Sequence, residues 1–180
     1  MEESRNAAGM VFWITGLSGV GKTTVAARLV ARLTPMGVKP LLLDGDVLRE
    51  IFGGGIGHGA EERRRLAFCY GRLCRELARQ GATVVCATIS MFEAVRAWNR
   101  TNIPRYTEIY LRASLAELAA QDEKGLYRRA LAGELRDVVG VDIEAEEPRA
   151  ADFVFDRSEG LAPDEIARRI LEQTDIPVTA

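Results

Sequence analysis

Histidine and cysteine are scarce in this chain of 180 residues, which contains one histidine and three cysteines. A zinc-type centre needs about four such ligands and a disulfide framework needs paired cysteines, so neither is expected. Long apolar runs are missing as well, because none approaches the roughly 18 residues of a membrane span. Neither sign of charge dominates, since 24 basic residues stand against 26 acidic ones. This balance argues against a general nucleic-acid or membrane-surface binder and leaves room only for a local basic pocket.

The composition is that of a globular protein, with 47% apolar and 28% charged residues. The length fits one domain, and we expect residues 1–180 to form it. The N-terminus, Met-Glu-Glu-Ser-Arg-Asn, is polar and acidic, unlike a secretory signal peptide, so we expect a cytoplasmic location. In that reducing compartment, Cys69, Cys74 and Cys86 are expected to be small core residues.

Short apolar segments alternate with segments of helical periodicity along the chain. Strands are expected at residues 10–15, 38–43, 82–89, 106–111 and 153–155, and the run at 38–43 is expected to be buried. Helices are expected at residues 22–33, 47–52, 61–79, 92–100 and 114–122, and after Pro163, whereas residues 123–148 are weakly helical at best. This alternation predicts an α/β fold, a parallel sheet of about five strands with helices on both faces. Ligands of such folds bind at the carboxyl ends of the strands, which predicts a site formed by residues 16–23, 44–46 and 88–90.

The segment after the first expected strand reads Gly-Leu-Ser-Gly-Val-Gly-Lys-Thr and matches the phosphate-binding pattern G-x-x-x-x-G-K-[ST]. Its glycines let the backbone approach phosphate oxygens, so that N–H groups point inward at the helix N-terminus. Lys22 is expected to contact the β- and γ-phosphates, and the Thr23 hydroxyl is expected to ligate Mg²⁺. The predicted ATP-binding residues are Gly16, Leu17, Ser18, Gly19, Val20, Gly21, Lys22, Thr23 and Thr24.

Two aspartates, Asp44 and Asp46, follow the second expected strand. A GTPase would carry a guanine-reading Asn-Lys-x-Asp segment, which is absent, and a motor or transporter ATPase usually has an acid after its third strand. A small-molecule kinase accommodates carboxylates after the second strand, where one can hold Mg²⁺ through water and the other can orient or deprotonate an attacking hydroxyl. We therefore predict a P-loop nucleoside-triphosphate kinase fold, with Asp44 near the metal and either aspartate as the base.

Further segments resemble the adenylylsulfate (APS) kinase family, and the resemblance covers nearly the whole chain. It rests on residues 13–19, on 43–46 with Arg49, on Ile89-Ser90, on 122–127, on 140–142 and on Glu147-Pro148. The Lys-Gly-Leu-Tyr block at 124–127 and the Gly-x-Asp segment at 140–142 are far more specific than the phosphate-binding pattern alone.

The resemblance implies that ATP and Mg²⁺ are used and that the γ-phosphate passes to the 3′-hydroxyl of APS. Ser90 matches a serine sometimes described as a phosphorylated intermediate, but direct in-line transfer needs none, so Ser90 is expected first as a substrate contact. Residues 123–142 match a mobile lid whose closure excludes water. The family's habit of forming dimers implies a homodimer. The acceptor-side residues implied by the resemblance are Asp46, Arg49, His58, Arg63, Ile89, Ser90, Lys124 and Leu126.

The chain departs from the family pattern on the acceptor side. His58 and Val138 stand where the family has two phenylalanines that clamp the acceptor's adenine. Leu66, Met91 and Gln121 replace a family asparagine, proline and arginine, respectively. Each lost stacking contact weakens the binding of an adenine acceptor by about 1–3 kcal/mol, although His58 could still stack.

Residues 89–92 and 138–142 also resemble a subgroup tied to surface-polysaccharide modification, which includes cytidine diphosphoramidate kinases. A cytidine nucleotide is therefore the alternative acceptor, because its smaller base needs less aromatic surface. A second alternative, from another class, is a nucleotide-binding regulatory module that transfers nothing. The presence of Asp44, Asp46 and Lys124 speaks against that alternative.

Overall fold

A five-stranded parallel sheet forms the centre of the molecule in the computed structural model, which describes residues 9–52, 56–122 and 124–176. Its order is β2-β3-β1-β4-β5, and every neighbouring pair is parallel. The expected α/β fold is confirmed. The strands are β1 (Val11–Thr15), β2 (Leu41–Asp44), β3 (Val84–Ala87), β4 (Tyr106–Arg112) and β5 (Phe153–Asp156).

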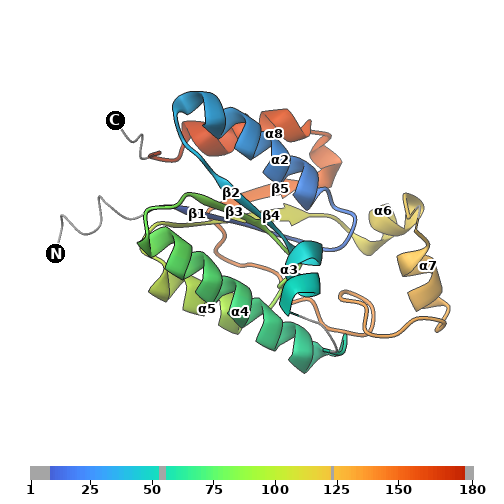
Figure 1. Ribbon diagram of the computed structural model, residues 1–180. Coiled ribbons are helices and arrows are strands. Elements are labelled where there is room, and N and C mark those ends of the chain that lie inside the picture. The colour runs from blue at the N-terminus through green and yellow to red at the C-terminus, as the bar shows by residue number, and fades with distance from the viewer. Residues whose placement is uncertain (1–8, 53–55, 123, 177–180) are drawn as a thin grey trace.

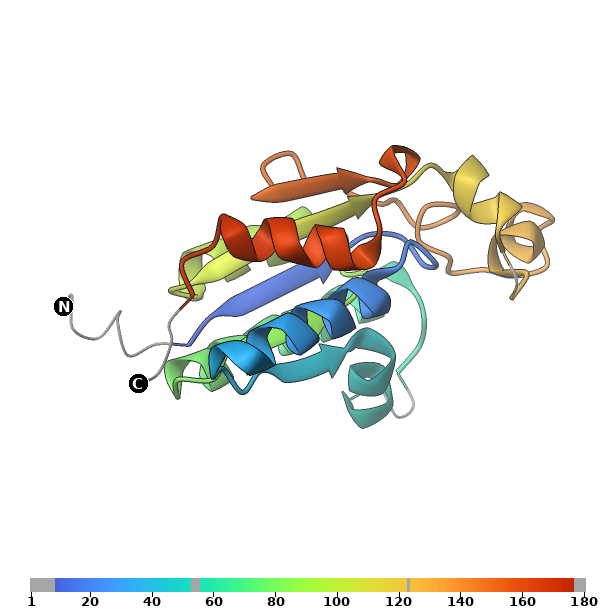
Figure 2. The same cartoon turned by 90° about the horizontal axis from the view of Figure 1, so that it is seen from above.

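Four longer helices cover the two faces of the sheet, as Figure 1 shows. On one face lie α2 (Lys22–Leu33) and α8 (Pro163–Glu172), which run next to each other over the strands when the molecule is seen from above (Figure 2). On the other face lie α4 (Ala60–Arg79) and α5 (Glu93–Asn102). The sheet is therefore enclosed on both sides, as its apolar strands require.

Shorter helical elements complete the structure, and α6 and α7 project from one end of the molecule (Figure 2). The short elements are α3 (Gly45–Phe52), α6 (Leu115–Ala120), α7 (Leu126–Leu131) and the 3-10 helices η1 (Thr34–Met36) and η2 (Arg157–Glu159). None of the helices in the described part of the chain combines the length and the apolar character of a membrane span.

Strand β1 shows why a continuously apolar run suits this fold. All five of its residues are buried, and alternate side chains point to opposite faces of the sheet. Phe12 and Ile14 join the core beneath α2 and α8, whereas Val11 and Trp13 join the core beneath α4 and α5. A third cluster lies at the α6–α7 end and includes Leu17 and Tyr127.

The second strand differs from its expectation. Residues 38–43 were expected to form a buried strand, but β2 begins at Leu41 and is an edge strand of the sheet. Leu41 and Leu42 are each 42% exposed. An apolar run predicts burial only where a neighbouring element covers it, and the described residues supply no cover on this edge.

Two further expectations are corrected. The stretch at 123–148, expected to be weakly helical at best, contains the helix α7, whose first turn is held by Asp122: its carboxylate accepts the N–H groups of Leu126, Tyr127 and Arg128. Cys69 is exposed rather than part of the core, because it lies on the outer side of α4, whereas Cys74 and Cys86 are buried as expected.

The sheet register brings the predicted site segments together. Asp44 at the end of β2 is the partner of Ala87 at the end of β3, and Ile14 of β1 is also paired with Ala87. The loop after β1, the aspartates after β2 and residues 88–90 after β3 therefore meet at one rim of the sheet.

Candidate active site

A cavity of about 390 Å³ opens at this rim. It brings together predicted residues from five separate segments of the chain. The predicted residues that line it are Ser18, Gly19, Gly21, Lys22, Thr23, Thr24, Asp44, Asp46, Arg49, Arg63, Ile89, Ser90 and Lys124. The predicted residues that do not line it are Gly16, Leu17, Val20, His58 and Leu126.

The loop between β1 and α2 has the backbone that a phosphate site needs. Gly16 has φ of 148°, and a Cβ atom at this position would lie 2.4 Å from the Leu111 carbonyl oxygen, so only glycine fits. Gly21, with φ of 102°, precedes the first residue of α2. The loop thus ends at a helix N-terminus, where unpaired N–H groups and the helix dipole favour an anion.

The Lys22 ammonium group donates a hydrogen bond to the Leu17 carbonyl, at 2.7 Å. Burial within the loop lowers the pKa of Lys22 to about 8, against the opposing effect of the Asp46 and Asp44 carboxylates. Phosphate oxygens are stronger acceptors than a peptide carbonyl. When a triphosphate binds, we therefore expect Lys22 to exchange its hydrogen bond with Leu17 for one with a phosphate oxygen.

Asp44 links the phosphate-binding loop to the second strand. Its Oδ2 accepts a hydrogen bond from the Thr23 hydroxyl at 2.7 Å, and its Oδ1 accepts the backbone N–H of Asp46 at 2.9 Å. A hydroxyl and a carboxylate are the hard oxygen donors that Mg²⁺ prefers, and Mg²⁺ keeps several waters of its own. The residues present therefore fit Mg²⁺, although no group of three or more His, Cys, Asp or Glu ligands occurs among the described residues.

Ser90 is held in an unusual backbone conformation, with φ of 28°. The hydroxyls of Thr88 and Ser90 lie 2.8 Å apart, and the Thr15 hydroxyl donates to the Ile89 carbonyl. Non-glycine residues with positive φ are uncommon and cluster at functional sites, where surrounding contacts hold them in place. Thr88 belongs to the segment 88–90 that was expected at the rim of the sheet, and it lines the cavity beside Ser90.

Two arginines hold the loop beyond α3. Arg49 donates to the Gly57 carbonyl at 2.5 Å, and Arg63 donates to the His58 carbonyl at 2.7 Å and to the Asp137 carbonyl at 2.9 Å. The His58 side chain is exposed, and its pKa is lowered by partial burial and by the nearby Arg49 and Arg63. His58 therefore lies next to the cavity's cations without lining the cavity itself.

The segment at 123–142 contacts both the phosphate-binding loop and α4, while residue 123 lies outside the described residues. The Tyr127 hydroxyl donates to the Ser18 carbonyl at 2.9 Å, and burial raises the pKa of Tyr127 to about 12. Asp142 accepts the N–H groups of Asp137 and Val138 at 2.7 and 2.6 Å, which fixes the turn next to Arg63. Leu126 is half-buried and packs in the cluster at this end rather than in the cavity.

Leu66 and Tyr70 of α4 also line the cavity. The sequence marked Leu66 as a departure from the family pattern but assigned Tyr70 no role in the site. Both side chains are nearly buried, and the Tyr70 ring lies 6.2 Å from that of Phe52. They present an apolar wall at the side where Arg63 lies. Helical periodicity marks this face of α4 as buried, but it does not distinguish a core contact from a cavity wall.

A second cavity of about 380 Å³ lies on the other side of the phosphate-binding loop. It shares Gly19, Gly21 and Thr24 with the first cavity. The remainder of its wall comes from the ends of β4 and β5 and from the start of α8, and it includes Leu111, Phe155, Leu161 and Pro163. Two openings of nucleotide-binding size therefore meet at one loop.

A loop shaped for phosphates, joined by Thr23 to the Asp44 carboxylate at the end of β2, places this chain among the P-loop kinases. A family model described as adenylylsulphate kinase matches residues 8–156. The chain belongs to the adenylylsulfate kinase family and is an ATP-dependent kinase.

Known relatives of two kinds resemble the chain. It is 37% identical over 161 residues to a probable bifunctional SAT/APS kinase from Sorangium cellulosum, covering 89% of this chain but only 28% of that relative. It is 40% identical over 151 residues to a cytidine diphosphoramidate kinase from Campylobacter jejuni, covering 82% of this chain and 86% of that protein. The APS kinase of Mycobacterium tuberculosis in complex with AMPPNP and APS superposes with a TM-score of 0.84 and 28% identity, covering 92% of this chain and 96% of the other.

Proposed function

We propose that this kinase transfers the γ-phosphate of ATP to the 3′-hydroxyl of a nucleotide acceptor, with APS as the first candidate. The observation that carries the proposal is the 2.7 Å hydrogen bond from Thr23 to Asp44. It joins the phosphate-binding loop to the carboxylates of β2 and α3 across a single cavity. The donor phosphate and the acceptor hydroxyl can therefore be held close together, which is the main requirement of phosphoryl transfer.

The donor half of the reaction uses residues 16–24. Backbone N–H groups of the loop and the N-terminus of α2 hold the phosphates, and Lys22 neutralises charge that develops on the transferred group. Thr23 and Asp44 would hold Mg²⁺, the latter directly or through water, and the ion would neutralise phosphate oxygens. The base and ribose of ATP are proposed to occupy the 380 Å³ cavity beside Thr24.

The acceptor half uses the opposite wall. Asp46 lies close enough to Lys22 to influence its pKa, and we propose that Asp46, supported by Asp44, orients and deprotonates the acceptor hydroxyl. Arg49, Arg63 and Lys124 supply positive charge for the acceptor's own phosphate or sulfate groups. Ser90 contacts the acceptor, and the Thr88 hydroxyl, 2.8 Å from that of Ser90, helps to hold the Ser90 hydroxyl in place.

Residues 123–142 are proposed to act as a lid. Tyr127 ties this segment to the Ser18 carbonyl, and Arg63 ties it to α4 through the Asp137 carbonyl. Closure over both substrates would exclude water and so favour transfer over hydrolysis of ATP.

A cytidine nucleotide, with cytidine diphosphoramidate as its example, is the second candidate acceptor. The specific observation in its favour is that neither residue at the positions of the family's two clamping phenylalanines lines the cavity: His58 is exposed, and Val138 is buried in the cluster at the α6–α7 end. The 40% identity to the Campylobacter jejuni cytidine diphosphoramidate kinase supports the same alternative.

ADP release from Mg·ATP, measured over a panel that contains APS and cytidine diphosphate derivatives, tests the proposal. We expect acceptor-dependent release by the wild type and a loss of roughly a hundredfold or more in Lys22→Ala. Lys39→Ala removes an exposed lysine remote from the cavity and serves as the matched control. If no nucleotide stimulates ADP release, the chain is a nucleotide-binding regulatory module. The acceptor with the highest kcat/KM decides between the two candidates.

A homodimer is also proposed. Nine large apolar side chains of the described residues are exposed, and seven of them lie between residues 36 and 56. They lie on η1, β2 and α3 and at residue 56. We propose that this stretch, with the unpaired edge of β2, forms a surface that meets its own copy across a two-fold axis. The seven residues of this surface are Met36, Leu41, Leu42, Val47, Ile51, Phe52 and Ile56.

A further inference from the structure

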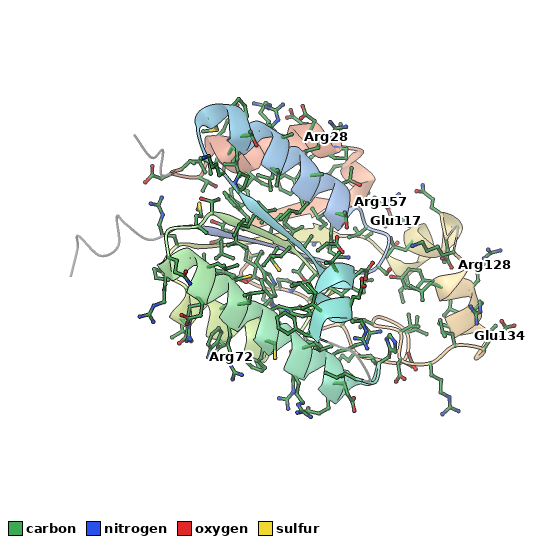
Figure 3. The ribbon with its side chains drawn as sticks, viewed as in Figure 1. Arg28, Arg72, Glu117, Arg128, Glu134 and Arg157 are labelled. Carbon is green, nitrogen blue, oxygen red and sulfur yellow. The ribbon has the colours of Figure 1, made fainter. Side chains whose placement is uncertain are left out.

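Arg157 lies directly behind the phosphate-binding loop, although it comes from the far end of the sheet. It opens η2 after β5, and the turn is fixed because the Asp156 carboxylate accepts the Ser158 N–H at 2.9 Å. The Arg157 guanidinium group donates to the Gly19 carbonyl at 3.1 Å and to the side-chain oxygen of Gln121. Figure 3 labels Arg157 on the side of the molecule where α6 and α7 lie.

Two cavities meet at this side chain. Arg157 and Gly19 line both the 380 Å³ cavity beside α8 and a cavity of about 340 Å³ beneath α7. The first of these is the proposed place of the ATP base, and it reaches the loop at Thr24. The hydrogen bonds to Gly19 and Gln121 restrain this planar guanidinium group at the boundary between the two cavities.

The charged residues at the boundary between these two cavities differ from the family pattern. Gln121 stands where that pattern has an arginine, so position 121 contributes no cation. Arg112, which also lines the 380 Å³ cavity, has its Nε 2.7 Å from an oxygen of Asp156, so that carboxylate offsets its charge. Arg157 bonds neutral amide and carbonyl oxygens instead, so its charge stays uncompensated by those contacts.

We propose that Arg157 is a donor-nucleotide residue whose guanidinium plane stacks on the base of ATP in the 380 Å³ cavity. Guanidinium groups stack well on aromatic rings, and the bonds to Gly19 and Gln121 leave a face of the group for this contact. Because the side chains of residues 121 and 157 touch, an arginine at either position can deliver the same group to the same place. The inference rests on the proposed use of ATP by this cavity.

Equilibrium binding of ATP and of inorganic tripolyphosphate, measured without acceptor by titration calorimetry, tests the proposal. Arg157→Ala should weaken ATP binding by about tenfold, because a stacking contact is lost. Tripolyphosphate has no base, so its Kd should change by less than about twofold. Arg72→Ala removes an arginine from the outer side of α4 and should leave both ligands unaffected.

The double variant Gln121→Arg with Arg157→Ala should recover most of the lost ATP affinity. An unchanged ATP Kd in Arg157→Ala would overturn the inference. Equal weakening of ATP and tripolyphosphate would also overturn it, since it would mean that Arg157 merely positions the loop. If the wild type itself fails to bind ATP, the proposed function fails instead, so the two failures are distinguishable.

Discussion

The protonation state of Lys22 controls the positive charge of the phosphate-binding loop. In the free protein its ammonium group bonds the Leu17 carbonyl, and burial lowers its pKa to about 8. The protonated form binds phosphate, so above pH 8 ATP binding must take up a proton. We predict that the Kd for ATP, measured without Mg²⁺, rises by about tenfold per pH unit above 8 and changes little between pH 7 and 8.

Lys22→Arg provides the control for this pH dependence, because its guanidinium stays charged throughout the range. The variant is expected to bind ATP with little dependence on pH between 7 and about 9.5. A wild-type Kd that stays constant across this range would show that Lys22 is protonated throughout, contrary to the prediction.

Residues of the site that belong to a local motif could be predicted from the sequence. The loop at 16–24 is contiguous, so its spacing alone defines its chemistry. Tyr70 could not be selected, because its place in the cavity depends on how α4 meets the rim of the sheet. His58 illustrates the opposite case, a residue implied by resemblance that lies outside the cavity.

The segment at 123–142, which we propose to be a lid, is the element whose attachment bears most directly on the reaction. Tyr127 is 2% exposed, and its hydroxyl is bonded to the Ser18 carbonyl. Tyr127→Phe removes this bond, worth about 1 kcal/mol, and shifts the lid about fivefold toward opening. We predict that ATP hydrolysis without acceptor rises severalfold relative to transfer.

Tyr106→Phe is the matched control for that prediction. Its hydroxyl lies 3.5 Å from Glu108, on β4 and remote from the lid, so the ratio of hydrolysis to transfer should stay unchanged. Paired assays of ADP and phosphorylated acceptor provide the ratio. A Tyr127→Phe ratio equal to that of the wild type would mean that the hydroxyl does not hold the lid.

Elements with strong periodicity could be predicted closely, and short or peripheral ones could not. The helix expected at 22–33 is α2 with the same bounds, because a glycine precedes it and apolar residues recur along one face. The helix α7 has six residues, too few for a periodic pattern, and depends on the Asp122 carboxylate. The exposure of β2 could not be predicted, because an apolar run carries no information about which neighbouring elements cover it.

At the scale of the whole molecule, a buried ion pair joins α5 to the centre of the sheet. The Arg96 and Glu108 side chains are 3% and 4% exposed, with Nε and Oε1 3.4 Å apart. Burial raises the pKa of Glu108, while Arg96 and Arg100 act in the opposite direction. Arg96→Met would leave the carboxylate short of one buried partner and is predicted to lower the free energy of unfolding by about 3 kcal/mol.

Chemical denaturation at pH 7 measures this change. Arg64→Met serves as the control, since it breaks an exposed pair with Glu61 and should lower stability by less than about 0.5 kcal/mol. Similar small effects in both variants would show that the Arg96–Glu108 pair contributes little.

The proposed dimer surface supplies a second prediction at this scale. Ile51 is 67% exposed and is the most exposed large apolar residue in the described chain. Ile51→Glu places a charge in the contact between two copies, so it should shift the protein to monomer in analytical ultracentrifugation. Leu131→Glu, at a position 62% exposed on α7, should leave the oligomeric state unchanged. A wild-type monomer at all concentrations would contradict the prediction.

The central claim is that one cavity holds a triphosphate on residues 16–24 and an acceptor hydroxyl beside Asp46. The most direct measurement follows radiolabelled γ-phosphate from ATP into the acceptor, in the wild type and in Asp46→Asn. We predict label on the acceptor's 3′-hydroxyl in the wild type and a transfer rate lower by about a hundredfold or more in the variant, with ATP still bound. Label found only as inorganic phosphate, or equal transfer by the variant, would contradict it.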